Sequence, residues 1–284
     1  MATTQTPAAA KPAAKKTPKA AKTGFTGIKS AGLVILTCFV IAVLFYTFWL
    51  GNPIQFVNND PANHPLEGNF WGLMHKGGPV VPCIQTLLLT VIALSFERFF
   101  AIRTAHGKGK LVSFVKSIKI ALNNGDIAAA EAIADKQRGC VANVVKATLL
   151  KYREMAENKS VPKEQKLIAI QKELEEATAL EMPMMQENLP IIAAITTLGT
   201  LTGLLGTVIG MIRSFAALAS GGSGDSLALS QGISEALINT AFGIGTSLFA
   251  VISYNYYTNK IDKLTYSLDE VGFTIVQTFA ANQE

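Results

Sequence analysis

Four stretches of the chain are apolar and free of charged residues, and each is 18 residues long or longer. They comprise residues 31–50, 79–96, 188–212 and 236–259. A bilayer core about 30 Å thick takes roughly 20 helical residues to cross. The pattern therefore predicts four transmembrane helices.

The segment between the second and third apolar stretches has a helical pattern. Residues 126–157 place apolar positions three and four apart, and Gly125-Asp126 provides a start signal. Residues 163–187 predict a second, charged helix, which we expect to run directly into the third span. The predicted fold class is an all-α membrane protein with four transmembrane helices, whose soluble helices form an extension beyond the membrane.

Composition argues against an ordinary soluble enzyme. Of the 284 residues, 49% are hydrophobic and 16% are charged, whereas soluble domains average about 25% charged residues. The residues outside the four predicted spans are too few for a separate catalytic domain of common size. Cys38, Cys83 and Cys140 form no CxxC pair, and the three histidines stand apart. We therefore expect no enzyme activity, no cofactor and no metal site.

Lysine and arginine set the orientation of the spans. Six lysines and no acid lie in the first 30 residues, and residues 103–187 carry 14 lysines and arginines. The connector 51–78 has one basic residue, Lys76, and the connector 220–225 has none. By the positive-inside rule, both termini and the segment 103–187 lie in the cytoplasm. The lysine-rich tail also resembles that of a linker histone, so a DNA-tethering membrane protein is an alternative, although we expect no nucleic-acid partner.

These boundaries divide the chain into alternating membrane and aqueous segments. They are a basic cytoplasmic tail (1–28), a first transmembrane helix (29–51), a periplasmic segment (52–78), a second transmembrane helix (79–104), a helical cytoplasmic region (105–187), a third transmembrane helix (188–220), a periplasmic loop (221–227), a fourth transmembrane helix (228–259) and a cytoplasmic C-terminal helix or tail (260–284).

The third and fourth spans carry small residues that allow close helix packing. Gly203, Gly206 and Gly210 lie on the third span, and Gly243 lies on the fourth. Hydroxyl side chains, among them Thr207, continue the same face of the third span. Close packing of the two helices would by itself explain this row of small and hydroxyl residues.

Glu235 changes that interpretation. It lies about 15 Å from the preceding loop at 1.5 Å per helical residue, near the middle of the bilayer. A carboxylate there costs roughly 3 kcal/mol and by default indicates an ion path. Asn239 continues its face of the helix, and Thr240 and Thr207 lie at a similar depth. The alternative is a protonated glutamic acid that only hydrogen-bonds a neighbouring helix.

Arg213, on the third span, is the one cation near this depth. It lies closer to the loop than Glu235 by half a turn or more. We therefore expect it to extend outward toward the aqueous phase and not to pair with Glu235.

Several motifs of the last two spans resemble the MotA/TolQ/ExbB proton-channel family, and its ExbB branch most. They are residues 202–211 (TGLLGTVIGM), 230–237 (SQGISEAL) and 240–243 (TAFG), and Glu97-Arg98 resembles a further signature at the end of the second span. The resemblance covers roughly residues 79–258. It implies that Glu235, Thr207 and Thr240 are polar residues of the ion path and that Asn255 matches a polar position near its cytoplasmic end.

The resemblance also implies partners and a cellular role. The chain would form a homopentamer in the lipid bilayer of the bacterial inner membrane, around an ExbD-like protein with a membrane aspartate, and would work with a TonB-like protein. Proton flow would then power import across the outer membrane. TolQ-like envelope maintenance, MotA-like motility and a non-conducting scaffold are the alternatives. Asn239 stands where the family often has alanine, and such extra polar oxygens could also coordinate sodium.

The first span is additional to the family's usual three. It is bulky and apolar all round and lacks a small polar stripe. We expect it to lie at the periphery, with Tyr46 and Trp49 as anchors near the membrane interface.

Overall fold

The computed structural model describes residues 30–61, 63–220 and 226–282, so the basic tail and most of the loop between the last two spans lie outside it. The described residues form helices and contain no strand. Four of the helical stretches are long and apolar enough to cross a membrane: Ala31–Leu50, Gly78–Asn123, Lys163–Ala216 and Leu229–Asn282. The predicted fold class, an all-α membrane protein with four spans, is confirmed.

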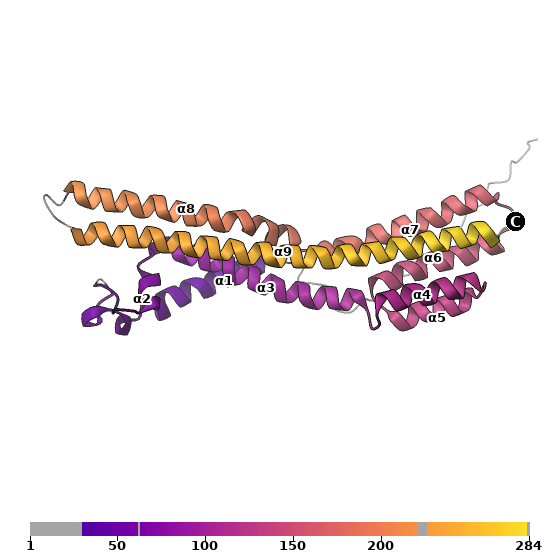
Figure 1. Cartoon of the computed structure of the whole chain (residues 1–284), viewed down its shortest axis with the longest axis horizontal. Helices are drawn as coiled ribbons and strands as arrows, with labels where there is room; N and C mark the ends of the chain where they lie inside the picture. The colour runs from indigo at the N-terminus through magenta and orange to yellow at the C-terminus, as the bar shows by residue number, and fades with distance from the viewer. Residues whose placement is uncertain (1–29, 62, 221–225, 283–284) are drawn as a thin grey trace, which may run out of the picture.

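Helix α9 organises the molecule. It runs without a break from Ser226 to Asn282, and its 57 residues give a length of about 85 Å. Figure 1 shows α8 (Leu189–Ser220), α1 (Ala31–Leu44) and α3 (Val81–His106) beside the first half of α9, and α4 to α7 beside its second half. One helix therefore links the apolar half of the chain to the polar half.

In the apolar half, α8 and α9 approach each other through glycines. A Cβ on Gly203 would lie 3.0 Å from the Cα of Gly243, and one on Gly243 would lie 2.6 Å from the Cα of Gly203. A Cβ on Gly206 would lie 2.5 Å from the Cβ of Asn239, and one on Gly210 would lie 2.8 Å from the carbonyl of Gly232. Larger side chains at these glycines would push the two helices apart.

Helix α1 continues as a π-helical turn, Phe45–Leu50, and packs against α3. Large apolar side chains on it, among them Leu36, Phe48 and Trp49, remain exposed in the single chain. Such a surface suits lipid or a neighbouring protein. Its place at the periphery of an assembly stays a prediction.

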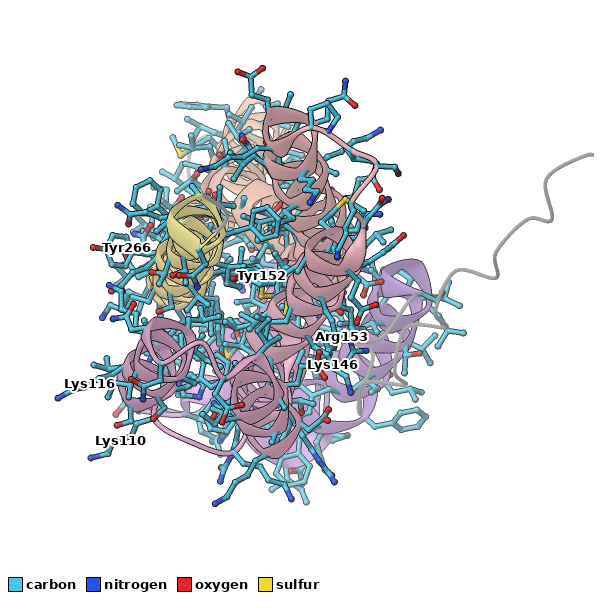
Figure 2. All side chains as sticks on the ribbon, turned by 90° about the vertical axis from the view of Figure 1, so that its right-hand side faces the viewer. Lys110, Lys116, Lys146, Tyr152, Arg153 and Tyr266 are labelled. Carbon is cyan, nitrogen blue, oxygen red and sulfur yellow. The ribbon has the colours of Figure 1, made fainter. Side chains whose placement is uncertain are left out.

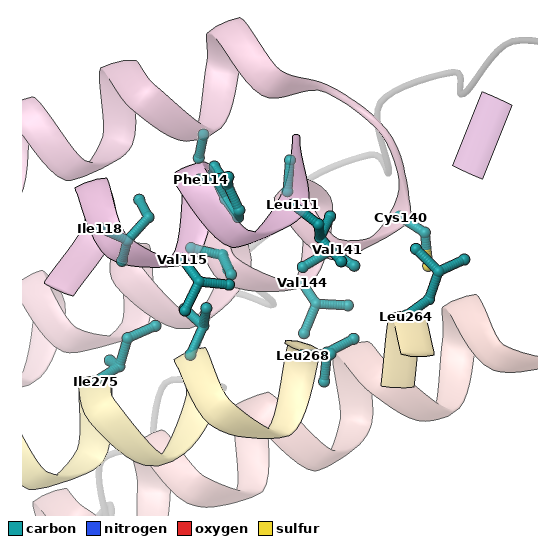
Figure 3. Packing of buried hydrophobic residues seen from close by; sticks show 14 of the residues in the cluster. Leu111, Phe114, Val115, Ile118, Cys140, Val141, Val144, Leu264, Leu268 and Ile275 are labelled. Carbon is teal, nitrogen blue, oxygen red and sulfur yellow. The ribbon is translucent and has the colours of Figure 1, made fainter. Parts of the chain in front are cut away.

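The polar half is a helical bundle with its own core. It contains α4 (Leu111–Asn123), α5 (Ile127–Gln137), α6 (Cys140–Glu157) and α7 (Lys163–Gln186), packed with the second half of α9. Figure 3 shows Phe114 and Ile118 of α4 facing the layer that contains Val144 of α6 and Leu268 of α9, and all four are buried. Figure 2 looks along this bundle: Tyr152 lies between the helices, while Lys110 and Lys116 extend outward.

The expectation of one helix over 126–157 was wrong. Asp126 does cap a helix, because its side chain accepts a hydrogen bond from the Ala129 amide at 2.8 Å. The helix ends at Gln137, however, and α6 begins at Cys140. The backbone turns at Gly139, with φ +88°, where a Cβ would lie 2.5 Å from the Ala105 carbonyl. The turn after α3 therefore packs directly against the turn between α5 and α6.

Helix α7 also does not run into the third span as expected. It ends at Gln186, and α8 begins at Leu189 after a turn in which Asn188 has φ +65°. Asparagine tolerates this left-handed conformation, and Pro190 suits the first turn of the next helix.

A buried arginine holds this junction. Arg98, fully buried on α3, donates from Nη1 to the carbonyls of Met184 and Met185 at 3.2 and 3.3 Å, and from Nε to Glu97 at 2.6 Å. The Asn188 amide donates to the same carboxylate at 3.3 Å. A cation thus binds the last carbonyls of α7, where a helix leaves unpaired acceptors. The Glu97-Arg98 motif joins the two halves of the molecule.

Candidate ion pathway

Glu235 is a buried carboxylate on α9. It is 8% exposed, and no other charged residue lies between Ser226 and Asn259. Its helix is held against α8 by the glycine contacts. An acid in such an apolar segment requires a compensating partner, and α8 provides one.

That partner is Arg213, so the expectation that it extends away from Glu235 was wrong. Arg213 Nη1 donates to Glu235 Oε1 at 2.7 Å. Counting residues from the loop compares the depths of the two Cα atoms, whereas the long arginine side chain covers the difference between them. The arginine side chain stays 50% exposed and the glutamate side chain 11% exposed.

A turn before α3 covers the ion pair. Gly78 has φ +73°, and a Cβ on it would overlap Glu235 Oε1 and lie 3.1 Å from Arg213 Nη1. Only glycine fits there, because both the backbone conformation and the close approach exclude a side chain. The segment between the first two spans therefore contributes to the surroundings of Glu235, a role that no local motif in the sequence indicated.

Tyr46 also faces inward. Its hydroxyl donates to the His75 carbonyl at 3.1 Å, and its ring stacks on His75 with centroids 4.6 Å apart. It lies close enough to Glu235 and Arg213 to interact electrostatically with both. The expectation that Tyr46 and Trp49 are anchors near the membrane interface stays a prediction; Tyr46 is half-buried, whereas Trp49 is exposed. Burial, followed by the charge of Lys76, lowers the pKa of His75, so this imidazole is mostly neutral at pH 7.

Asn239 connects α9 to the same turn. Its side chain is fully buried, and its amide donates to the Gly77 carbonyl at 2.8 Å. Its Oδ1 has no hydrogen-bond partner within the described chain. Asn239 thus lies beneath the turn.

Thr207 and Thr240 form a pair across the two helices. Their hydroxyls are hydrogen-bonded to each other. One hydroxyl donates in this bond, and the other can donate to a carbonyl of its own helix, that of Gly203 at 3.2 Å for Thr207 or that of Ala236 at 3.2 Å for Thr240. In the described structure neither hydroxyl is hydrogen-bonded to Glu235, whose side chain accepts a hydrogen bond from Arg213. The single chain therefore separates the carboxylate from the hydroxyl pair.

Asn255 lies apart from these residues. It is exposed on α9, about 22 Å further along the helix than Thr240. The structure brings Glu235, Asn239, Thr207 and Thr240 to the interface of α9 with α8 and the turn, and it does not bring Asn255 there. A continuous path to Asn255 would require surfaces outside this single chain.

Further polar atoms are buried between the spans. Gln85 and Thr90 of α3 and Thr246 and Ser247 of α9 are at least nine-tenths buried, and their side-chain polar atoms lack hydrogen-bond partners within the described residues. Such atoms are the ones that internal water binds. Gln85 was missed at the sequence level, although a glutamine inside an apolar span is itself a signal.

The candidate site lies in a segment that is similar to a known protein family. The model of the MotA/TolQ/ExbB proton channel family matches residues 141–270, which include α8 and the part of α9 that carries Glu235. Over these residues the chain is similar to the MotA/TolQ/ExbB family. The matched segment also contains both threonines of the hydroxyl pair, whereas α1, α3 and the turn at Gly78 lie outside it.

Individual similar proteins have the names TolQ and ExbB. The Tol-Pal system protein TolQ of Pseudomonas aeruginosa is 26% identical over 69% of this chain and 86% of its own length. A putative biopolymer transport protein, ExbB-like 1, of Synechocystis is 43% identical over 28% of this chain and 33% of its own length. The biopolymer transport protein ExbB of Salmonella typhimurium is 31% identical over 30% and 35%. The chain thus spans most of TolQ but less than half of the other two relatives.

Proposed function

We propose that the chain is an ExbB-like subunit of an ion-driven motor in the bacterial inner membrane. With an ExbD-like single-span protein and a TonB-like protein, it would couple the proton motive force to import across the outer membrane. The observation that carries the proposal is Glu235, a buried carboxylate within the segment that matches the proton-channel family. A buried charge inside a span is costly, and its presence favours a role in ion transfer.

The proposed path contains Glu235 as the group that takes up and releases the ion. Thr207, Thr240 and Asn239 would orient water around it, and Asn255 would lie near the cytoplasmic end. Each charge that crosses 100 mV yields about 2.3 kcal/mol, so a few ions suffice for a mechanical step. The proposed role involves no covalent chemistry. We propose that the transported ion is the proton, and a flux measurement would distinguish proton transport from sodium transport.

The surfaces of α8 and α9 support an assembly in the bilayer. Large apolar side chains stay exposed on both helices: Leu201, Leu204, Leu205, Val208, Ile212 and Phe215 on α8, and Leu237, Ile244, Leu248 and Ile252 on α9. Contiguous apolar surface of this kind suits lipid and neighbouring subunits. We propose a homopentamer around the partner's helix, with both termini of each chain in the cytoplasm. A proton relay needs a second carboxylate besides Glu235. Glu97 is already bound to Arg98, so we propose that the partner provides this carboxylate.

A TolQ-like role in envelope integrity is the second candidate. The match to the Pseudomonas TolQ extends over 204 residues, against 85 for the Salmonella ExbB. The longer match covers 69% of this chain, against 30% for the Salmonella ExbB. Envelope maintenance would use the same ion path with different partners.

Replacing the native gene tests both roles in one experiment. Cells that carry Glu235→Gln should make the protein at normal levels but lose either TonB-type import or envelope integrity, and the defect identifies the branch. Glu270→Gln, which loses only a half-exposed ion pair with Lys119 in the polar half, is the matched control and should behave as wild type. Normal import and normal detergent resistance with Glu235→Gln would contradict both roles.

A further inference from the structure

The Arg213–Glu235 pair is open on one side. Glu235 is nearly enclosed by α8 and the turn at Gly78, whereas half of the Arg213 side chain is exposed. The exposed half of Arg213 is part of the open surface of α8 in this stretch, where the adjacent Ile212 is also exposed. A group that packs on this surface would therefore reach the guanidinium before it reached the carboxylate.

The contact between the two charges is also incomplete. Within the described chain, one guanidinium nitrogen, Nη1, donates to one carboxylate oxygen, Oε1. An arginine has five N–H donors in a planar fork, and two of them can bind one carboxylate together. The buried pair of Arg98 and Glu97 uses two nitrogens on two oxygens. Arg213 thus keeps donors with which it can bind a second carboxylate more fully than it binds Glu235.

We propose that Arg213 is an exchangeable counterion, which holds Glu235 ionised in the chain alone and passes to a carboxylate of the partner helix when that helix docks against α8. Glu235 then loses its compensating charge inside an apolar segment and takes up a proton from a hydronium ion. The carboxyl O–H bond forms as an O–H bond of the hydronium ion breaks, and a water molecule leaves. The inference rests on the proposed function, since the incoming carboxylate belongs to the proposed single-span partner.

This exchange explains how docking and protonation are linked. The groups that face Glu235 are Arg213 from α8, the backbone of the turn at Gly78 and Tyr46 from the first span. Arg213 is the cation among them. A shift of its guanidinium by a few ångströms changes the charge balance at Glu235 without any movement of α9. Arg213 is a positioning residue in this scheme, because it acts through Glu235.

Carbodiimide labelling measures the protonation of Glu235 directly. Dicyclohexylcarbodiimide reacts with protonated carboxyl groups in apolar surroundings, and mass spectrometry of the labelled chain separates Glu235 from Glu97. In membranes that contain the full chain without partner, Arg213→Gln should label at Glu235 about tenfold faster than wild type, the change that a loss of about 1.4 kcal/mol gives. Arg213→Lys, which keeps the charge, should stay near wild type. Arg103→Gln, an exposed arginine on α3, is the matched control, and labelling of Glu97 should not change in any variant.

Adding the partner tests the exchange step. Co-expression of the single-span partner should raise labelling of Glu235 in the wild-type chain, and a partner whose membrane carboxylate is changed to an amide should not. Equal labelling of wild type and Arg213→Gln would overturn the counterion, and no rise with the partner would overturn the exchange. Both results are independent of transport, so normal transport with Glu235→Gln would remove the proposed function while leaving a labelling difference in place.

Discussion

The Asn239 side chain on α9 donates a hydrogen bond to the Gly77 carbonyl at 2.8 Å, across 162 positions of sequence. This bond fixes the turn before α3 against the helix that carries Glu235. Because the turn also covers the Arg213–Glu235 pair, the segment between the first two spans is part of the candidate ion site and more than a connection.

Asn239→Ala should destabilise the protein. It leaves the buried Gly77 carbonyl without its donor, which costs about 1–3 kcal/mol. The thermal midpoint of the purified protein in detergent should fall. Asn255→Ala, an exposed asparagine on the same helix, is the matched control and should leave the midpoint within error. A similar midpoint for both variants would show that the turn is held by other contacts.

Gly78→Ala should disturb Glu235 itself. Its Cβ would overlap Glu235 Oε1, and its φ of +73° adds backbone strain of about 1 kcal/mol or more. Gly68 has a similar φ of +76° with nothing within 4 Å of a Cβ, so Gly68→Ala carries the strain alone. Transport in cells should fall for Gly78→Ala and stay near wild type for Gly68→Ala. Equal transport in the two variants would mean that the turn does not constrain the carboxylate.

Arg98→Met should be among the most destabilising substitutions. It removes the cation of a fully buried ion pair, so Glu97 loses its counterion and two carbonyls of α7 lose the guanidinium, a loss of about 3–5 kcal/mol. Arg103→Met, on an exposed position of the same helix, should change stability by about 0.5 kcal/mol or less. Folded yield and thermal midpoint check the difference. A midpoint for Arg98→Met close to that of Arg103→Met would exclude a structural role for the junction.

Cys140 should make the stability of the bundle fall at alkaline pH. Burial, followed by the nearby Glu181 carboxylate, raises the pKa of its thiol far above the usual value of about 8.5. The unfolded chain therefore loses this proton above about pH 8.5 while the folded chain keeps it, so the thiol's contribution is complete below that pH and is lost as the pH rises. The loss is at most about 1.4 kcal/mol per pH unit.

Thermal midpoints between pH 8 and pH 10 measure this effect. The midpoint of the wild-type protein should decline more steeply than that of Cys140→Ala, in which the titrating thiol is absent. Parallel declines would indicate that lysine and tyrosine titration account for the whole slope.

The spans and the position of Glu235 could be predicted because each depends on a local property of the sequence. Uncharged runs long enough to cross a bilayer define the spans. A single acid in such an apolar region is recognised because it is the one charged residue there. The hydroxyl pair of Thr207 and Thr240 was found at a common depth by the same counting. These predictions needed no knowledge of which other segments lie nearby.

Contacts between distant segments could not be predicted in this way. The pairing of Arg213 with Glu235 depends on the reach of a long side chain, which residue counting ignores. The turn at Gly78 meets Glu235 only because α3 and α9 pack together. The break at Gly139 has a similar cause, since its turn packs against the turn that follows α3. A single glycine in a helical pattern does not by itself show whether another backbone lies against it.

Ion flux through the assembled complex tests the central claim, that Glu235 carries the ion. Complexes of this chain with the proposed single-span partner would be reconstituted in vesicles, and pH-sensitive and sodium-sensitive dyes would follow flux under an imposed potential. Wild type and Glu270→Gln should conduct protons, while Glu235→Gln, which keeps size and hydrogen bonding but cannot titrate, should assemble normally and fall to the background of empty vesicles. Proton flux near the wild-type rate in assembled Glu235→Gln complexes would contradict the account.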